Sequence, residues 1–401
     1  MYIPSSFLYD IIRSERIGVF CESNSQGHRA IVAKLPTSTI KAIALGAKVE
    51  LYVFINSQKP HYLALCMKVF DNKSSPLHAV ITQRWNNSNN LLDISFFDTK
   101  LNLVLFDETD TPIQGCKIKI AINSENKCFS DIIGKTSLES ADNYAEAGNF
   151  MDSVCSVLGF DYNINPDYSI MCFKFSVEII DSSVIKIIHV NRQGATHYDL
   201  VQDIDGVRQE RQIYQSLCLM SNSKTIISPF VTIGKKEREL TDILTITKDH
   251  KLIAIESKCL QVDSDAVNKS YDRTATSIIK HCKKGLGQLE GVFKTLKKGE
   301  KVYDNKKILL LNRDFLFYGI VLIDEYRHSE SWSEIINLIL MLRDIHGICL
   351  NIISLSEMMY IIKLCKSDTE LFIKSLDYRY RTCIRTNTID IQFKNSALPE
   401  F

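Results

Sequence analysis

The sequence predicts a protein of mixed α+β or α/β class in two parts, a β-rich module followed by a mixed β-sheet flanked by helices. The chain has 401 residues, 45% hydrophobic and 24% charged, which suits a globular protein of more than one domain. Short apolar runs separated by turns dominate the first half, whereas helical and strand patterns alternate in the second. We therefore predict a module over residues 1–195, with a subdivision near residue 125 as an alternative, and a second domain over 196–401.

The first part contains runs that are typical of strands. They are short, apolar or alternating, and bounded by turn-rich segments: Val49–Ile55, Tyr62–Phe70, Leu92–Phe97 and Leu101–Phe106. A helix is predicted around Leu138–Leu158, before Gly159. Ser169–Ile180 and Val184–Val190 flank the turn-like DSS and predict a hairpin. The turn NRQGATH, residues 191–197, is the predicted domain boundary.

The second part alternates between helical and strand patterns, which predicts a sheet covered by helices. The predicted helices are Val207–Met220, Thr276–Leu296 and Trp332–His346. The predicted strands are Thr225–Phe230, the hairpin Leu240–Cys259, Lys307–Leu311, Phe317–Ile323 and Cys349–Ser354. Residues 355–401 are expected to begin as helix and continue as irregular or β structure.

The composition limits which partners and which cellular compartment we expect for this protein. A formal net charge of +1 gives no overall attraction to nucleic acid or an anionic membrane, so such affinity requires a local patch. The apolar runs are shorter than the roughly 20 residues that span a bilayer, and the start lacks a secretory pattern, so no membrane partner is expected. The 12 cysteines form no CxxC pair. We expect reduced, packing cysteines in a cytoplasmic protein.

The hairpin LTDILTITKDHKLIAIESKC places three charged side chains, Asp242, Glu256 and Lys258, among apolar residues. Side chains alternate along a strand, so Glu256 and Lys258 share one face. With the turn centred near residues 248–249, Asp242 comes nearly opposite Glu256. A shift of one residue in register would separate them. We therefore predict that two carboxylates and a lysine meet at the open end of the hairpin.

Two carboxylates this close raise each other's pKa unless a cation lies between them. Mg²⁺ is suited to this position because it binds oxygen and often uses only one or two protein carboxylates, and Mn²⁺ is an alternative. Lys258 could then orient or deprotonate an attacking water, or offset charge in the transition state. This grouping indicates metal-assisted phosphodiester hydrolysis. The alternative is an edge hairpin with a solvated salt bridge, which protects the edge from aggregation.

Asp242 followed after 13 residues by Glu256-Ser257-Lys258, at the end of the apolar strand IAIESK, resembles the D…ExK signature of the PD-(D/E)xK nuclease superfamily. The similarity is to its NERD and RecB-like branches and covers about residues 197–354. It implies a restriction-endonuclease-like fold and a metal-dependent nuclease, with DNA favoured as substrate and endonuclease cleavage expected. Asp242 and Glu256 would bind the metal, together with the carbonyl of Ser257. Thr241 stands where many members have proline.

Two helices carry further residues that the resemblance implies. An acidic residue on the first helix often joins the site, and Glu210 lies in line with Ile213, Tyr214 and Leu217. Glu239, just before the hairpin, is the rival for this role. Gln288 on the helix after the motif is the candidate orienting group, with an exposed surface glutamine as the alternative.

The clearest basic patch lies between residues 280 and 307, where nine lysines face three acids. Its candidate nucleic-acid contacts are Lys280, Lys283, Lys284, Lys294, Lys297 and Lys298. Binding through them would depend steeply on salt. The alternative is a solvated helix end, where lysines complement the helix dipole.

The resemblance also suggests a restriction- or defence-type effector, paired as a homodimer or higher oligomer. In that setting the N-terminal module would sense, target or bind a regulator. The rival class is a nucleic-acid-binding or assembly factor that keeps the fold without catalysis.

Overall fold

The computed structural model describes residues 2–24, 26–58, 62–83, 92–122, 126–135, 144–160, 168–184, 187–191, 194–260, 262, 270–305, 307–309, 311, 313–327 and 331–393. The chain forms two compact units, described separately below. Unit 1 is built mainly from Met1–Lys186, and unit 2 from Ile187–Tyr198, Gln202–Val262 and Ser270–Phe401. Among the described residues, no helix has both the length and the apolar character needed to cross a bilayer.

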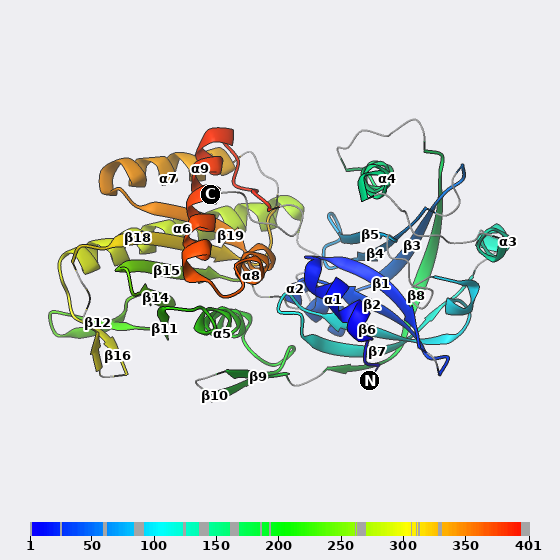
Figure 1. Ribbon diagram of the computed structural model, residues 1–401, viewed down its shortest axis with the longest axis horizontal. Coiled ribbons are helices and arrows are strands. Elements are labelled where there is room, and N and C mark those ends of the chain that lie inside the picture. Colours follow the sequence, from blue (N-terminus) through cyan, green and yellow to red (C-terminus); the bar gives the residue numbers. More distant parts are fainter. Residues whose placement is uncertain are drawn as a thin grey trace. The chain divides into compact units, whose positions relative to one another are not determined.

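Unit 1 is organised around one eight-stranded sheet, in the order β1-β2-β6-β7-β8-β3-β4-β5 (Figure 1). The strands are β1 (Gly18–Ser23), β2 (Arg29–Lys34), β3 (Val49–Asn56), β4 (Leu63–Val69), β5 (Leu77–Thr82), β6 (Lys100–Phe106), β7 (Pro112–Ile120) and β8 (Ile170–Val184). Neighbours are antiparallel except for the parallel pair β2 and β6. Strand β8 lies between β7 and β3, so strands from both sides of residue 125 belong to one sheet.

The described helices of unit 1 are α1 (Ser6–Ser14), α2 (Thr37–Ala44), α3 (Lys127–Lys135) and α4 (Tyr144–Val157). Helix α4 confirms a helix in the predicted Leu138–Leu158 region, of which residues 138–143 lie outside the described part. Part of the core is aromatic: the Phe129 ring packs against Phe97, Phe173 and Phe175 at centroid distances of 4.8–5.1 Å.

Two predictions for unit 1 are wrong. Leu92–Phe97 is not a strand, because Ile94–Phe96 form a 3₁₀ turn capped by the Asp93 side chain. The DSS segment is not a hairpin turn either. It continues β8, with Asp181, Ser182 and Ser183 paired to β7 beyond a bulge. Polar residues at an exposed strand position resemble a turn locally, but the ladder to β7 keeps them extended.

Unit 2 has a five-stranded mixed sheet in the order β11-β14-β15-β18-β19. Its strands are β11 (Ser223–Ile227), β14 (Ile243–Thr247), β15 (Lys251–Lys258), β18 (Leu316–Ile323) and β19 (Cys349–Ser354). Strands β15, β18 and β19 are parallel, whereas β14 and β11 are antiparallel to their neighbours. Strand β18 and the middle of β15 are apolar, as expected for parallel strands with both faces of the sheet covered.

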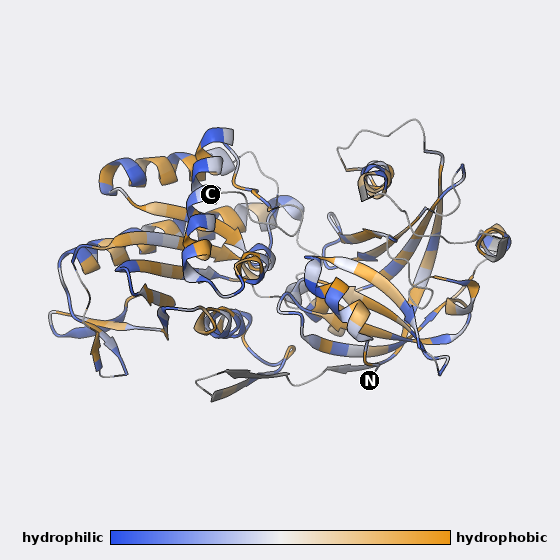
Figure 2. Cartoon of the chain, viewed as in Figure 1, coloured by the Kyte–Doolittle hydropathy of each residue, from blue (hydrophilic) through white to orange (hydrophobic). Residues whose placement is uncertain are grey.

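Helices cover both faces of this sheet, and hydrophobic residues concentrate between the layers (Figure 2). Helix α5 (Asp205–Cys218), α8 (Leu355–Leu364) and α9 (Thr369–Thr386) pack on the face of Ile253 and Ile255. Helix α6 (Tyr271–Lys297) and α7 (Trp332–His346) pack on the face of Leu252 and Ala254. The predicted bounds of α7 and β19 are confirmed.

Two smaller sheets complete unit 2. One has the order β13-β12-β16-β17, from β12 (Phe230–Ile233), β13 (Lys236–Glu239), β16 (Val302–Asp304) and β17 (Lys307–Leu309). The other pairs β9 (Ile187–Asn191) with β10 (Gly194–Tyr198), so the described residues of the predicted boundary segment, 191 and 194–197, belong to these two strands. The strand predicted at Thr225–Phe230 is confirmed only over Thr225–Ile227, because Ser228 has a positive φ of 47° and separates β11 from β12. The protein is thus of mixed α and β structure.

Candidate active site

The hairpin β14–β15 has the register expected from its sequence. Ile243 pairs with Ile255 and Leu244 with Ala254, so Asp242 and Glu256 occupy the next opposing positions. Thr241, just before Asp242, donates its hydroxyl to the carbonyl of Ile255 at 2.9 Å. The Ser257 amide donates to Asp242 Oδ2 at 2.7 Å. These bonds extend the hairpin beyond its ladder and hold Asp242 beside β15.

Asp242, Glu256 and Lys258 meet at this end of the hairpin. Lys258 Nζ lies 2.8 Å from Glu256 Oε2 and 3.9 Å from Asp242 Oδ2. The two carboxylate oxygens can be no farther apart than the sum of these distances. Rotation of the two side chains can shorten this separation to one at which both oxygens bind the same cation. The side chains are shielded from water, with exposures of 2% for Glu256, 12% for Lys258 and 19% for Asp242. The lysine is therefore a shielded cation between two acids.

Helix α6 supports Lys258 from one side. Gly285 lies against β15 and β18 so closely that a Cβ there would be 2.9 Å from Val321 Cγ1 and 3.4 Å from Lys258 Cε. Glycine at this position leaves room for the lysine stem between helix and sheet. His281, one turn earlier, has its pKa lowered by burial and by the charges of Lys258, Lys284 and Lys280. This face of α6 thus adjoins the charged cluster.

The acids of the cluster are held in surroundings that disfavour their ionised forms. Burial raises the pKa of Glu256, and the charge of Asp242 raises it further, against the opposing effect of Lys258. Burial also raises the pKa of Asp242. The site thus places two carboxylates beside a single lysine in shielded surroundings, a condition that favours a further cation when both acids are ionised.

Glu210 of α5 belongs to the same electrostatic cluster. Its pKa is raised to about 7 by burial first, then by the charges of Asp242 and Glu239. Glu239, the last residue of β13, is exposed and also raises the pKa of Asp242. Both rivals for the upstream acidic position therefore lie within electrostatic range of Asp242.

The donor set fits a cation held by two carboxylates and water rather than a closed cage. Within the described ranges, no three His, Cys, Asp or Glu side chains are grouped so that they could hold a metal ion together. Asp242 and Glu256 are the two carboxylates available to a cation at this position. Ser257 lies between Glu256 and Lys258 in the sequence. Two carboxylates completed by water are a common arrangement for Mg²⁺.

Within the part of the chain that the structure describes, Gln288 forms no hydrogen bond to this cluster. It is exposed and lies seven residues after His281 on α6, on nearly the same face of the helix but two turns further along. His281 is the α6 residue whose pKa responds to Lys258.

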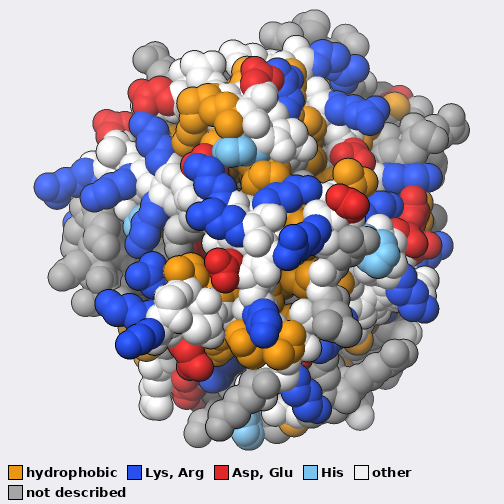
Figure 3. All heavy atoms as spheres, turned by 90° about the vertical axis from the view of Figure 1, so that its left-hand side faces the viewer, with side chains coloured by type: hydrophobic (Ala, Val, Ile, Leu, Met, Phe, Trp, Pro, Cys, Tyr) orange, Lys and Arg blue, Asp and Glu red, His pale blue; other side chains and the backbone are white. Residues whose placement is uncertain are grey.

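The six predicted nucleic-acid-binding lysines are all exposed on α6 or at its C-terminal cap, Lys298. Lys283 pairs with Glu334, and Lys294 pairs with Glu290 at 2.6 Å. Lys297 donates to the Arg313 carbonyl at 3.2 Å and lies 4.6 Å from the Phe315 ring centroid. Figure 3 shows lysine and arginine side chains gathered on the side of the molecule where β12 and β16 lie.

Sequence reasoning missed two polar residues beside the cluster, Gln209 and Asp324. Gln209 precedes Glu210 on α5 and is fully buried. Asp324 directly follows β18, whose last residue pairs with Lys258 in the parallel ladder. An acidic residue just after a buried parallel strand was the available signal, since such residues collect at the carboxyl edge of the sheet.

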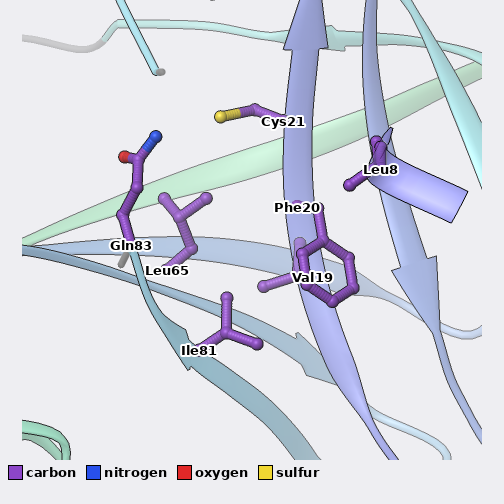
Figure 4. Close-up of a pocket in the computed structure, with 7 residues that line it drawn as sticks. All are labelled: Leu8, Val19, Phe20, Cys21, Leu65, Ile81 and Gln83. Carbon is purple, nitrogen blue, oxygen red and sulfur yellow. The ribbon is translucent and has the colours of Figure 1, made fainter. Parts of the chain in front are cut away.

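Unit 1 has an open hollow of about 380 Å³ lined by Tyr2, Tyr9 and Phe106 among others, and a much smaller cavity (Figure 4). The small cavity has a volume of about 10 Å³ and is lined by side chains of α1, β1, β4 and β5 and by Gln83, which directly follows β5. A volume near 10–15 Å³ accommodates about one water molecule. This cavity is packing space rather than a ligand site.

Comparison with known proteins adds no family. No family model matches the chain, and no curated protein matches it.

Proposed function

We propose that this protein is a metal-dependent nuclease that hydrolyses phosphodiester bonds, with DNA as the favoured substrate. The observation that carries the proposal is the meeting of Asp242, Glu256 and Lys258 at the end of one hairpin, where two carboxylates beside a single lysine are shielded from solvent. The mixed five-stranded sheet with helices on both faces supports the restriction-endonuclease-like arrangement that the D…ExK resemblance implies.

The roles follow from the positions of the side chains. Asp242 and Glu256 would hold a Mg²⁺ or Mn²⁺ ion together with the Ser257 carbonyl, and Glu210 or Glu239 would add a carboxylate at longer range. The ion would supply Lewis-acid stabilisation of the phosphate and a more acidic water. Lys258 holds a positive charge beside both carboxylates, where it can orient the attacking water or offset negative charge as it develops.

The exposed lysines of α6 supply a site for the substrate backbone. Lys280 and Lys284 lie on the helix that adjoins Lys258, and their charges reach His281 beside the cluster. Phosphate contacts of this kind position nucleic acid without reading its sequence.

The test is a cleavage assay with Mg²⁺ or Mn²⁺ on duplex DNA, single-stranded DNA and RNA. We expect cleavage by the wild type, and a loss of at least about 100-fold in Asp242→Asn and Lys258→Ala, because both remove charge at the reacting phosphate. Lys374→Ala is the matched control, since Lys374 is an exposed lysine on α9. Cleavage by Lys258→Ala at the wild-type rate would refute the site.

The second candidate is a nucleic-acid-binding protein without catalysis. The ion pair between Lys258 and Glu256 is compatible with it, because Lys258 offsets the charge of Glu256 without a metal. Salt-sensitive DNA binding by a wild type that cleaves none of the three substrates would establish this alternative.

A further inference from the structure

Gln209 links helix α5 to the strand that carries Lys258. Its Oε1 accepts a hydrogen bond from Ser257 Oγ at 2.5 Å, and its Nε2 donates to Asp324 Oδ1 at 2.8 Å. The side chain is fully buried. One amide therefore uses both its acceptor and a donor to connect two neighbouring strand ends.

Asp324 holds the next two residues after Lys258. Its Oδ2 accepts from the Leu260 amide at 2.7 Å, and its Oδ1 accepts from Cys259 Sγ at 3.0 Å. Burial raises the pKa of Asp324 to about 6, with these two bonds acting in the opposite direction. The carboxylate thus accepts three donors where the chain leaves β15.

Lys258 consequently lies between neighbours that are held by side chains from other elements. Ser257 is held on one side by Asp242 through its amide and by Gln209 through its hydroxyl. Cys259 and Leu260 are held on the other side by Asp324. Strand ends fray without such partners, and a misplacement of about 1 Å at a reacting centre costs on the order of 100-fold in rate.

Resting on the proposed nuclease function, we infer that Gln209 and Asp324 are positioning residues that fix the direction of Lys258 toward Glu256. They act through the Ser257–Leu260 backbone and touch no reacting atom.

Gln215 provides a matched contrast on the same helix. It is also buried on α5, but neither its Nε2 nor its Oε1 has a hydrogen-bond partner among the described residues. If burial of a glutamine on α5 mattered only for folding, Gln209→Ala and Gln215→Ala would have similar consequences. A positioning role predicts that only Gln209→Ala alters the site.

The experiment compares the full-length wild type with Gln209→Ala, Gln215→Ala and Asp324→Asn in steady-state cleavage of the substrate that the wild type cuts best. We expect kcat to fall about 10- to 100-fold in Gln209→Ala and Asp324→Asn, as for residues that orient a catalytic group, with KM within about threefold. Gln215→Ala should keep the wild-type kcat. Ser257→Ala, which keeps the backbone amide and carbonyl, should reduce the further effect of Gln209→Ala, because the hydrogen bond between these two residues is then already lost and only the bond from Gln209 to Asp324 remains to be removed.

A second readout follows the Lys258 ammonium by NMR in protein with ¹⁵N-labelled lysine, its signal assigned by its loss in Lys258→Ala. A changed signal in Gln209→Ala but not in Gln215→Ala supports the inference, even if the wild type cuts nothing and the nuclease proposal fails. Equal kcat values for Gln209→Ala and Gln215→Ala in an active enzyme overturn the inference and leave the nuclease proposal standing. An unchanged ammonium signal in Gln209→Ala overturns it in either case.

Discussion

Replacing Glu210 by glutamine should stabilise the metal-free protein at pH 8. The folded-state pKa of Glu210 is raised from 4.5 to about 7, so the unfolded chain loses this proton at lower pH than the folded protein does. Between these values the folded state binds more protons, and stability therefore falls as pH rises. The destabilisation caused by ionised Glu210 is fully present above pH 7 and disappears below about pH 4.

The magnitude follows from the same pKa. A rise from 4.5 to about 7 corresponds to roughly 3 kcal/mol. Glu210 is partly exposed, and solvent screening reduces this to about 1–2 kcal/mol. Glutamine keeps the shape and removes the charge, so the free energy of unfolding should rise by that amount at pH 8 and hardly change at pH 4.

The assay is urea denaturation of wild type and Glu210→Gln at pH 4 and pH 8 in chelator, repeated at pH 8 with Mg²⁺. Glu237→Gln serves as the control, because Glu237 is exposed on β13 outside the cluster. Added Mg²⁺ should stabilise the wild type more than Glu210→Gln, since a ligand stabilises in proportion to its affinity for the folded state. A variant no more stable than the wild type at pH 8 would refute the placement of Glu210 among like charges.

Three further predictions concern packing, salt and pH. Gly285→Ala should lower the free energy of unfolding in urea by about 1–3 kcal/mol, because its Cβ would meet Val321 at 2.9 Å. Gly287→Ala, where an added Cβ has no atom within 4 Å, should leave this free energy unchanged or raise it by up to about 1 kcal/mol. Equal effects of the two variants would contradict the close packing of α6. The double variant Lys280→Ala/Lys284→Ala should reduce the slope of log Kd against log salt for duplex DNA by about 2 in fluorescence anisotropy, and an unchanged slope would exclude these lysines from the interface. The cleavage rate with Mg²⁺ should rise from pH 6 to pH 8. The reason is that Glu210, with a pKa of about 7, and the shielded acids Asp242 and Glu256 must lose their protons to hold a cation. A rate independent of pH over this range would argue against carboxylate ligands.

Local patterns were sufficient where the structure is set by neighbouring residues. The bounds of α7 and β19 follow from apolar periodicity and from the Gly347 that ends the helix. The hairpin register follows from side-chain alternation and a short turn, which together bring Asp242 opposite Glu256. The turn predicted at residues DSS, 181–183, is wrong, because pairing with β7 continues a strand that these residues do not favour by themselves.

The sequence by itself therefore determined the grouping of Asp242, Glu256 and Lys258, since all three belong to one hairpin whose geometry is local. Only the tertiary structure decided what surrounds them. Gln209 comes from α5, 48 residues from Ser257, and Asp324 directly follows β18, 65 and 64 residues from Cys259 and Leu260. Pairing of β15 with β18 and packing of two helices against the sheet bring them together. Such contacts depend on which elements become neighbours, and no spacing within one segment encodes that choice.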